Sequence, residues 1–509
     1  MIRFDWIEKW ADYSPSKIAV KEYETNRTLT YAELNRVANF LATKFSHELD
    51  IQPKDRIVVL AENSIEHIVL FSICQKIGTI LVPLNYRLAQ RELDYQIQNS
   101  DPSIIIIEEK FEEKIKGLES IKKVKKIISL KELSRIIEEE KSFEHKVSVK
   151  VYINEDDPIF ILYTSGTTGL PKGALYTHRM LVWNSFNTSM RLDLTSEDRS
   201  VSCTPMFHTG GWNVIPTPFL HRGAYVCLMK KFDPDIILQL LEKEKATMFM
   251  AVPTMLSMMA QSQYFEKTNL SSVKFFIIGG EPMPLPLIEL WHRKGVPIRQ
   301  GYGLTEVGPS VTSLHQDDAV RKMGSIGKIN FYIYHRVVDE NGNDVKQGEV
   351  GELILKGPSV TIGYWRDEEA TKESIKNGWF YTGDLVKEDE EGFLFIVDRK
   401  KNMFISGGEN VYPAEIEKFL YTHPSVKEIS VIGVPDEKWG EVGKAFIVVK
   451  EGKKLSAKEI LEYCEGNLAK YKIPKYIEFV NEIPKTDTGK IDKKKLLELH
   501  NKSIIKNKN

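Results

Sequence analysis

Residues 159–173 read IFILYTSGTTGLPKG, an apolar run that passes directly into a loop of glycines, hydroxyl side chains and one lysine. The first five residues are typical of a buried strand. Glycines allow consecutive backbone N–H groups to turn toward one point, while Thr164, Ser165 and Lys172 add hydroxyl groups and a positive charge. The stretch therefore predicts a strand followed by a phosphate-binding loop, with a spacing that differs from the GxxxxGK[ST] loop of P-loop proteins.

The sequence before this loop alternates between helical and strand patterns. Apolar residues recur at helical spacing over residues 31–45, and Thr30 is the predicted N-cap. Short β-rich runs at 56–60 and 79–83 flank a helical segment at 64–77. Such alternation predicts parallel sheets in an α/β domain. The Lys- and Glu-rich run at 108–150 is expected to be solvated surface.

The pattern of predicted secondary structure changes near residue 324. Short β-rich runs are separated by turn sequences at 340–343, 346–348 and 391–392, which predicts a small β-barrel or β-meander lobe. A polar stretch at 398–402 precedes a mixture of helical and strand patterns. We therefore expect an α/β fold with two domains: a large N-terminal domain of α/β subdomains and a β-barrel lobe over residues 1–398, and a small mobile α+β domain over 399–509.

The bulk composition narrows the class of protein. The chain has 70 Lys and Arg against 71 Asp and Glu, and this balance argues against a nucleic-acid partner. Its four cysteines form no CxxC pair, so buried thiols in a reducing compartment are expected. The first residues lack the apolar block of a leader, and no apolar run reaches the ~18 residues of a transmembrane segment. We expect a cytoplasmic protein.

Further motifs follow the glycine-rich loop in a fixed order. They are PMFHTGG at 205–211, GGE at 279–281, QGYGLTE at 300–306, YTGD at 381–384, DRKKNMFISGG at 398–408 and PKTDTGK at 484–490. Together with the loop they resemble the adenylate-forming superfamily, which includes acyl-CoA synthetases, aryl-CoA ligases, luciferases and peptide-synthetase adenylation domains. The resemblance covers nearly the whole chain. It implies that ATP activates a carboxylic acid as an acyl-adenylate, which then passes its acyl group to coenzyme A.

The resemblance also implies roles for individual residues. Attack of a carboxylate on the α-phosphorus of ATP brings two anions together, so the site must neutralise both and hold them in line. The implied catalytic residues are Lys490, bridging the carboxylate and the α-phosphate, Thr305 on the α-phosphate, Glu306 on Mg2+ with Thr164, and His208 beside the acyl group. The implied nucleotide contacts are Thr164, Ser165, Gly166, Thr167, Thr168, Gly169, Lys172, Gly279, Gly280, Glu281, Gln300, Gly301, Tyr302 and Gly303, with Asp384 and Arg399 on the ribose.

One lysine cannot serve both half-reactions, because it occupies the place that the attacking thiol needs. Members of the superfamily rotate the C-terminal domain after the adenylate has formed. The resemblance implies that Lys401 is the hinge and that Gly407 and Gly408 line the thiol channel, where a missing side chain lets pantetheine pass.

The acid itself is less strongly specified. No Lys or Arg occurs between Pro205 and His221, which favours an uncharged acid, and Trp212 and Phe219 are candidates for an apolar tunnel or for core packing. The overall pattern resembles medium- or long-chain fatty-acid–CoA ligases. The alternatives are an aryl-acid or o-succinylbenzoate–CoA ligase, a ligase that loads a carrier protein, a luciferase-type oxidation and a non-catalytic nucleotide-binding protein. The expected partners are the acid, ATP and CoA, with a homodimer left open.

Overall fold

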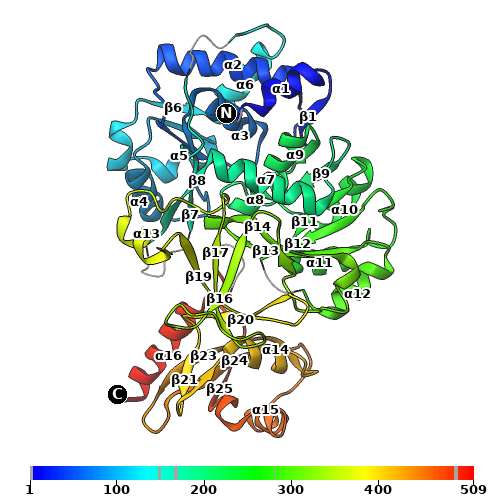
Figure 1. The fold of residues 1–509 in the computed structure, drawn as a ribbon, viewed down its shortest axis with the longest axis vertical. Coiled ribbons are helices and arrows are strands. Elements are labelled where there is room, and N and C mark those ends of the chain that lie inside the picture. The colour runs from blue at the N-terminus through cyan, green and yellow to red at the C-terminus, as the bar shows by residue number, and fades with distance from the viewer. Residues whose placement is uncertain (1–3, 147–150, 165–169, 281–282, 487–490, 509) are drawn as a thin grey trace. The chain divides into compact units, whose positions relative to one another are not determined.

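The computed structural model describes residues 4–146, 151–164, 170–280, 283–486 and 491–508. The chain divides into two compact units, one comprising Met1–His335 and Ile354–Tyr381, the other Arg336–Leu353 and Thr382–Asn509. Helices alternate with strands in mixed sheets (Figure 1), and this confirms the predicted α/β class with a large N-terminal and a small C-terminal part. The predicted boundary between residues 398 and 399 falls inside the second unit and stays a prediction.

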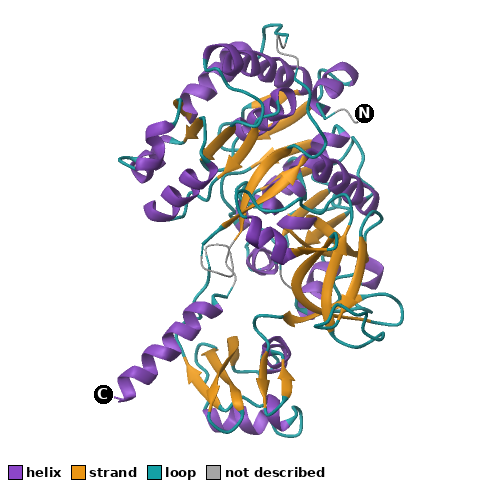
Figure 2. Cartoon of the chain, turned by 60° about the vertical axis from the view of Figure 1, so that its left-hand side comes forward, coloured by secondary structure: helices purple, strands orange, loops and turns teal. Residues whose placement is uncertain are grey.

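One sheet of the first unit carries the glycine-rich loop. Its strand order is β6-β5-β3-β4-β7-β8, parallel except for the antiparallel pair β7 and β8. The central strands are apolar on both faces because helices cover both, as expected for a parallel sheet (Figure 2). The strands are β3 (Arg56–Leu60), β4 (Ile80–Pro83), β5 (Ile104–Ile107), β6 (Lys126–Ser129), β7 (Pro158–Thr164) and β8 (Lys172–Thr177).

The other sheet of this unit has strand order β15-β14-β13-β12-β11-β9-β10-β1-β2. It is parallel from β1 to β13 and antiparallel at both edges. The carboxyl ends of its parallel strands therefore meet at one edge, where ligands of open α/β sheets bind. The strands are β1 (Ile18–Glu22), β2 (Thr28–Thr30), β9 (Arg199–Ser202), β10 (Tyr225–Leu228), β11 (Met248–Ala251), β12 (Phe275–Ile278), β13 (Ile298–Leu304), β14 (Gly308–Leu314) and β15 (Lys328–Ile329).

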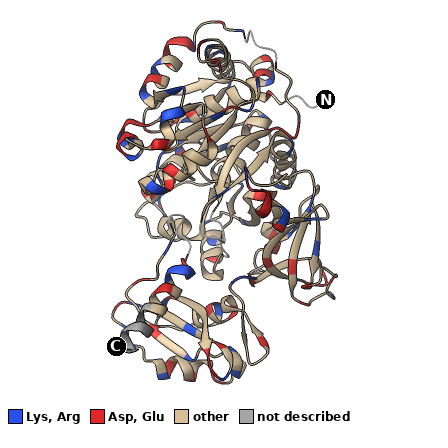
Figure 3. Cartoon of the chain, turned by 90° about the vertical axis from the view of Figure 1, so that its left-hand side faces the viewer, with Lys and Arg blue, Asp and Glu red and all other residues tan. Residues whose placement is uncertain are grey.

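The helices of this unit begin and end where local chemistry predicts. Thr30 caps α2, since its hydroxyl accepts from the N–H of Glu33 at 3.2 Å while the Glu33 carboxylate accepts from the N–H of Thr30 at 2.7 Å. Charges of both signs are interspersed along the outer helices (Figure 3). The helices are α1 (Trp6–Tyr13), α2 (Tyr31–Glu48), α3 (Ile65–Ile77), α4 (Gln90–Ser100), α5 (Glu112–Ile115), α6 (Leu130–Glu140), α7 (His178–Leu192), α8 (Thr209–Asn213), α9 (Pro216–Arg222), α10 (Pro234–Lys243), α11 (Pro253–Ala260), α12 (Leu285–Arg293) and α13 (Glu368–Ser374).

The charged run at 108–150 differs from its prediction. It supplies the edge strand β6 and the helix α6, whose Leu133 and Ile137 are fully buried. Together with Leu130 they form a buried apolar stripe at helical spacing that docks this helix, although Lys and Glu are frequent in its sequence.

The remaining strands form two smaller sheets. One has the order β16-β17-β19-β18, with β20 beside β19, and the other has the order β22-β21-β24-β23, with β25 beside β24. Among the described residues, no helix has the length and apolar character needed to cross a membrane. The elements are β16 (Tyr334–Val338), β17 (Gly351–Lys356), β18 (Ile375–Lys376), β19 (Trp379–Glu388), β20 (Leu394–Arg399), β21 (Phe404–Ser406), β22 (Glu409–Val411), β23 (Val426–Asp436), β24 (Gly440–Val449), β25 (Tyr476–Phe479), α14 (Pro413–Leu420), α15 (Ala457–Cys464) and α16 (Lys493–Lys508).

Candidate active site

The glycine-rich loop is the connection of the antiparallel β7–β8 hairpin. Thr164 and Lys172 face each other across the two strands, so the loop starts and ends at one place. The loop residues predicted to bind phosphate lie outside the described residues: Ser165, Gly166, Thr167, Thr168 and Gly169. The same holds for Glu281 and Lys490. The structure therefore describes the base of the loop, and the roles of these seven residues stay predictions.

Two hydroxyl groups converge on the carboxylate of Glu306. This residue lies in the short 3-10 turn η3 (Thr305–Val307) between β13 and β14, and it is 9% exposed. Its Oε1 accepts a hydrogen bond from the hydroxyl of Tyr364 at 3.0 Å, and the Thr164 hydroxyl lies 3.5 Å away. The N–H of Thr361 donates to the backbone oxygen of Glu306 at 2.7 Å and fixes the turn. The structure thus brings the predicted residues Thr164 and Glu306 together.

Tyr364 was not predicted as a site residue. Burial raises the pKa of the Tyr364 hydroxyl well above its usual value, and the negative charge of Glu306 raises it further. The hydroxyl therefore stays protonated and donates. The Lys172 ammonium lies 5.5 Å from the centre of the Tyr364 ring. Tyr364 therefore contacts both Glu306 and Lys172, although it belongs to none of the sequence motifs.

The chemistry of these donors fits Mg2+. Carboxylate and hydroxyl oxygens are the hard ligands that this ion takes in proteins, usually one or two per site with water and phosphate oxygens completing the shell. Among the residues that the structure describes, no group of three or more His, Cys, Asp or Glu side chains is arranged to hold a metal. A magnesium ion at Glu306 would therefore depend on the phosphates of a bound nucleotide.

The predicted nucleotide contacts of the second sheet gather at the carboxyl ends of β12 and β13. Ile278 pairs with Gln300, so the chain leaving β12 as Gly279-Gly280 runs beside Gln300-Gly301-Tyr302. A Cβ atom on Gly303 would lie 2.1 Å from the carbonyl oxygen of Pro309, so only glycine fits there. Gln300 Oε1 accepts from the N–H of Met283 at 3.1 Å and holds the loop after β12. The structure therefore places Gly279, Gly280, Gln300, Gly301, Tyr302 and Gly303 next to one another.

The predicted ribose contacts form an ion pair within the second unit. Asp384 on β19 faces Arg399 on β20, and Asp384 Oδ1 lies 2.6 Å from Arg399 Nε. The carboxylate is almost fully buried, whereas the guanidinium is half-exposed. Lys401, the predicted hinge, is exposed in the turn between β20 and β21.

The glycines of the predicted thiol channel form a tight hairpin turn. Gly407 (φ +60°) and Gly408 (φ +89°) connect β21 to β22, and Ser406 pairs with Glu409. A two-residue hairpin loop with positive φ at both positions strongly favours glycine. The local turn thus accounts for both glycines without a thiol, and their role in a channel stays a prediction.

The segment around His208 is partly a site and partly core. His208 is half-buried at the start of α8, and its ring lies 4.5 Å from the ring of Phe207. Trp212 and Phe219 are fully buried, and Trp212 packs against Phe160. These two aromatics fill the core of the first unit, which favours the packing alternative over the tunnel.

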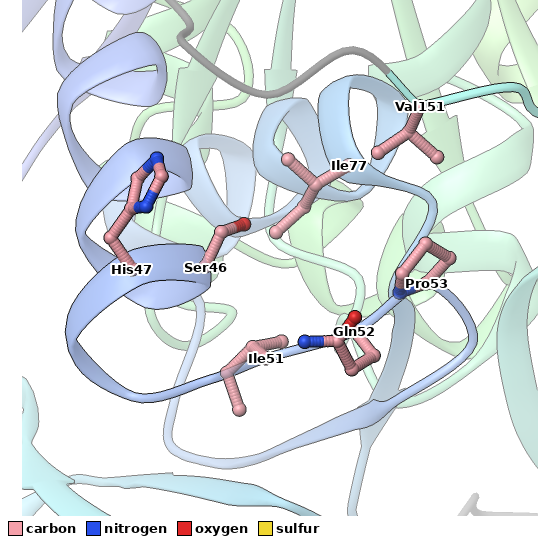
Figure 4. A pocket seen from close by; sticks show the side chains of 7 residues that line it. All are labelled: Ser46, His47, Ile51, Gln52, Pro53, Ile77 and Val151. Carbon is pink, nitrogen blue, oxygen red and sulfur yellow. The ribbon is translucent and has the colours of Figure 1, made fainter.

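Two cavities of the first unit differ in whether residues of the sequence motifs line them. One, of about 170 Å3, lies at the ends of α2 and α3 and is lined by Ser46, His47, Ile51, Gln52, Pro53, Ile77 and Val151 (Figure 4). It contains no predicted site residue. The other, of about 50 Å3, borders Gly279, Gln300 and Gly301. The smaller cavity therefore belongs to the candidate site.

Comparisons with known proteins show the family to which the chain belongs. Residues 7–365 match the family described as AMP-binding enzyme, and residues 415–490 match the AMP-binding enzyme C-terminal domain. The chain is 37% identical over 486 residues to a feruloyl-CoA synthase of Amycolatopsis sp, covering 96% of each chain. It is 36% identical over 500 residues to a long-chain-fatty-acid–CoA ligase of Mycobacterium tuberculosis, covering 97% of this chain and 98% of the relative. It is similar to the solved o-succinylbenzoate CoA synthetase from Bacillus subtilis in complex with its acyl-adenylate intermediate (TM-score 0.86, 31% identity, 97% of each chain).

Proposed function

The chain belongs to the AMP-binding enzyme family as an AMP-forming acid–CoA ligase, and from this premise we propose how its own residues carry out the reaction. ATP, Mg2+ and coenzyme A are the ligands expected of such a ligase. The observation that supports the proposal best is the convergence of Thr164 and Tyr364 on the Glu306 carboxylate, beside Lys172.

In the first half-reaction, Glu306 and Thr164 would hold the magnesium ion that accompanies ATP, and the ion would neutralise phosphate charge. Tyr364 donates to Glu306 and so orients the carboxylate before the nucleotide arrives. Lys172, at the end of the loop, adds a positive charge for the leaving pyrophosphate. The substrate carboxylate then attacks the α-phosphorus, with Thr305 on the α-phosphate and His208 beside the acyl group.

Lys490 is proposed to bridge the substrate carboxylate and the α-phosphate. A long stem with a compact charge suits a residue that reaches into a site from another segment. Lys490→Ala is expected to abolish adenylate formation and to leave the attack of CoA on supplied acyl-AMP largely intact. Adenylate formation by this variant at the normal rate would remove Lys490 from the proposal.

The second half-reaction is proposed to use a hinge at Lys401, with Gly407 and Gly408 beside the thiol and Asp384 and Arg399 on the ribose. Lys401→Pro is expected to spare adenylate formation and to block thioester formation, because proline fixes φ at the hinge. Equal loss of both half-reactions would exclude a hinge role.

The acid belongs to the proposal as well. The sequence pattern favours a medium- or long-chain fatty acid, whereas the printed names of relatives include feruloyl, o-succinylbenzoate and long-chain fatty acyl substrates. A place in fatty acid metabolism would follow only from a fatty acyl substrate. A steady-state assay of thioester formation with CoA and, separately, with a phosphopantetheinylated carrier protein tests the thiol. Turnover with the carrier alone would replace CoA in the proposal.

A further inference from the structure

A segment at residues 359–365, which we call the strap, lies along strand β8 in the first unit. The N–H of Trp365 donates to the carbonyl oxygen of Gly173 at 2.7 Å. The N–H of Leu175 donates to the carbonyl oxygen of Gly363 at 3.1 Å. Because β8 is the last strand of its sheet, the strap pairs with its outer edge.

The strap also holds the turn that carries Glu306. The N–H of Thr361 donates to the backbone oxygen of Glu306 at 2.7 Å, and the hydroxyl of Tyr364 donates to the carboxylate at 3.0 Å. The first bond fixes the backbone of the turn, and the second orients its side chain. Glu306 is therefore held twice by one segment, which is itself paired with β8.

Thr361 is the residue at which the two attachments meet. Its hydroxyl donates to the carbonyl oxygen of Leu175 on β8 at 2.6 Å and accepts from the N–H of Gly363 at 3.1 Å. Its own N–H bonds to Glu306. Thr361 is only 4% exposed, so water is poorly placed to replace a lost bond, and buried groups left without a partner are costly. One small side chain thus sets the separation between the Glu306 turn and β8.

The strap is held beyond Thr361 as well. The indole Nε1 of Trp365 donates to the carbonyl oxygen of Asn99 on α4 at 3.0 Å. Between these two positions the chain bends at Gly363, where φ is +140° and a Cβ atom would lie 2.6 Å from Thr371 Cγ2. The bend therefore requires glycine. Thr361 acts within a frame that is fixed on both sides.

The two segments that Thr361 joins both carry groups of the proposed reaction. Strand β8 begins at Lys172, and the turn presents Glu306. A positive charge and a magnesium-binding carboxylate stabilise phosphate charge best when their positions are set before the nucleotide arrives. A change in their separation would weaken the grip on the magnesium nucleotide without removing either group.

We propose that Thr361 is a positioning residue for adenylate formation, whose hydroxyl and N–H together hold the Glu306 turn against β8 before the magnesium nucleotide binds. The inference rests on the proposed function, since Thr361 acts through Glu306 and touches no substrate itself. It requires that the hydroxyl of Thr361, and not the volume of its side chain, sets the magnesium requirement.

Three substitutions at this position separate hydroxyl from volume. Thr361→Val keeps the volume and the N–H but removes the hydroxyl, whereas Thr361→Ser keeps the hydroxyl and loses the methyl group. The measurement is the free Mg2+ concentration for half-maximal acid-dependent exchange of pyrophosphate into ATP by the purified full chain. We expect this concentration to rise about tenfold in Thr361→Val and to stay within about twofold of wild type in Thr361→Ser. Thr361→Ala differs from Thr361→Ser by the hydroxyl alone, so this second pair gives the same test if the valine variant does not fold.

Ser359→Ala is the matched control in the same strap. Ser359 is 1% exposed, and its hydroxyl has no hydrogen-bond partner among the described residues. Its removal should leave the magnesium requirement unchanged. In Thr361→Val, attack of CoA on supplied acyl-AMP should stay within about twofold of wild type, because that step follows the loss of pyrophosphate.

The outcomes are distinct. A packing role alone predicts the reverse order, with Thr361→Val like wild type and Thr361→Ser impaired, and that result would overturn the inference. An equal rise in Ser359→Ala would overturn it too. Either result leaves the proposed function standing, whereas a wild-type protein that shows no exchange with any fatty or aryl acid would overturn the proposed function itself.

Discussion

Two buried glutamates of the first unit have different partners. Glu66 on α3 is fully buried, lies 2.7 Å from Arg27 Nη1 and accepts from the Ser134 hydroxyl at 2.6 Å. Glu306 on η3 accepts from the Tyr364 hydroxyl and lies near the Thr164 hydroxyl. A guanidinium neutralises the first carboxylate, whereas neutral hydroxyls orient the second. The difference teaches that partner chemistry, and not burial alone, separates a structural carboxylate from one that we propose serves the reaction.

Electrostatics at Glu66 support this distinction. Burial opposes its ionisation, but the hydrogen bond and charge of Arg27, with the Ser134 hydroxyl, outweigh burial and hold the pKa of Glu66 below its usual value. Arg27 also pairs with Glu22 on β1, whose pKa is raised by burial and by repulsion from Glu66. The arginine therefore joins the β1–β2 hairpin to α3 and has a structural task.

The largest expected effect is on catalysis. Glu306→Gln keeps the shape and removes the charge that we propose holds magnesium. Acid-dependent exchange of pyrophosphate into ATP should fall by about 10³-fold. The melting temperature should change by no more than a few degrees, because the amide oxygen can still accept from Tyr364. Exchange within tenfold of wild type would contradict the role of Glu306.

The next effect is on stability. Glu66→Gln leaves Arg27 with one carboxylate fewer in a buried site. The free energy of unfolding for the first transition in urea should therefore fall by about 3 kcal/mol. Activity of the folded protein should stay near wild type. Glu197→Gln, at an exposed carboxylate paired with Lys17, is the matched control and should change stability little. A loss below about 1 kcal/mol for Glu66→Gln would place Glu66 among the weak surface pairs.

Acid should destabilise the first unit, where three histidines on α3, α7 and α9 are buried. Burial lowers the pKa of His67, His178 and His221 to about 4. Unfolding returns each to about 6.5, so the unfolded chain binds more protons between pH 4 and pH 6.5. Stability should therefore fall as pH drops through this window, by up to about 1.4 kcal/mol per pH unit for each histidine. The difference between the melting temperatures at pH 7.0 and pH 5.5 measures this loss of stability. His67→Phe should make that difference smaller. A flat profile would contradict neutral buried histidines.

The smallest effect concerns the orientation of Glu306. Tyr364→Phe removes one hydrogen bond, worth about 1 kcal/mol, so the magnesium concentration for half-maximal activity should rise about fivefold. Tyr334→Phe, at an exposed tyrosine, is the control. A lower melting temperature with unchanged magnesium dependence would mean that Tyr364 only packs.

Much of the fold, and the meeting of two motifs at the candidate site, follow from local patterns. The run at 56–60 forms β3, the predicted N-cap Thr30 caps α2, and the motifs at 159–173 and 300–306 meet at Thr164 and Glu306. Tyr364 escaped prediction because it follows an irregular segment and reaches Glu306 only through tertiary packing. The placement of Gly279 beside Gly301 depends on the register of β12 and β13, which the sequence of a single strand does not encode.

The two-step chemistry has one direct test. Purified protein is mixed with ATP, Mg2+ and, one at a time, a panel of fatty and aryl carboxylic acids in the absence of any thiol, and the products of one turnover are separated by mass spectrometry. Our account predicts about one equivalent each of acyl-adenylate and pyrophosphate per enzyme, with the adenylate consumed when CoA is added. ADP with inorganic phosphate, or ATP left unchanged with every acid of the panel, would contradict it.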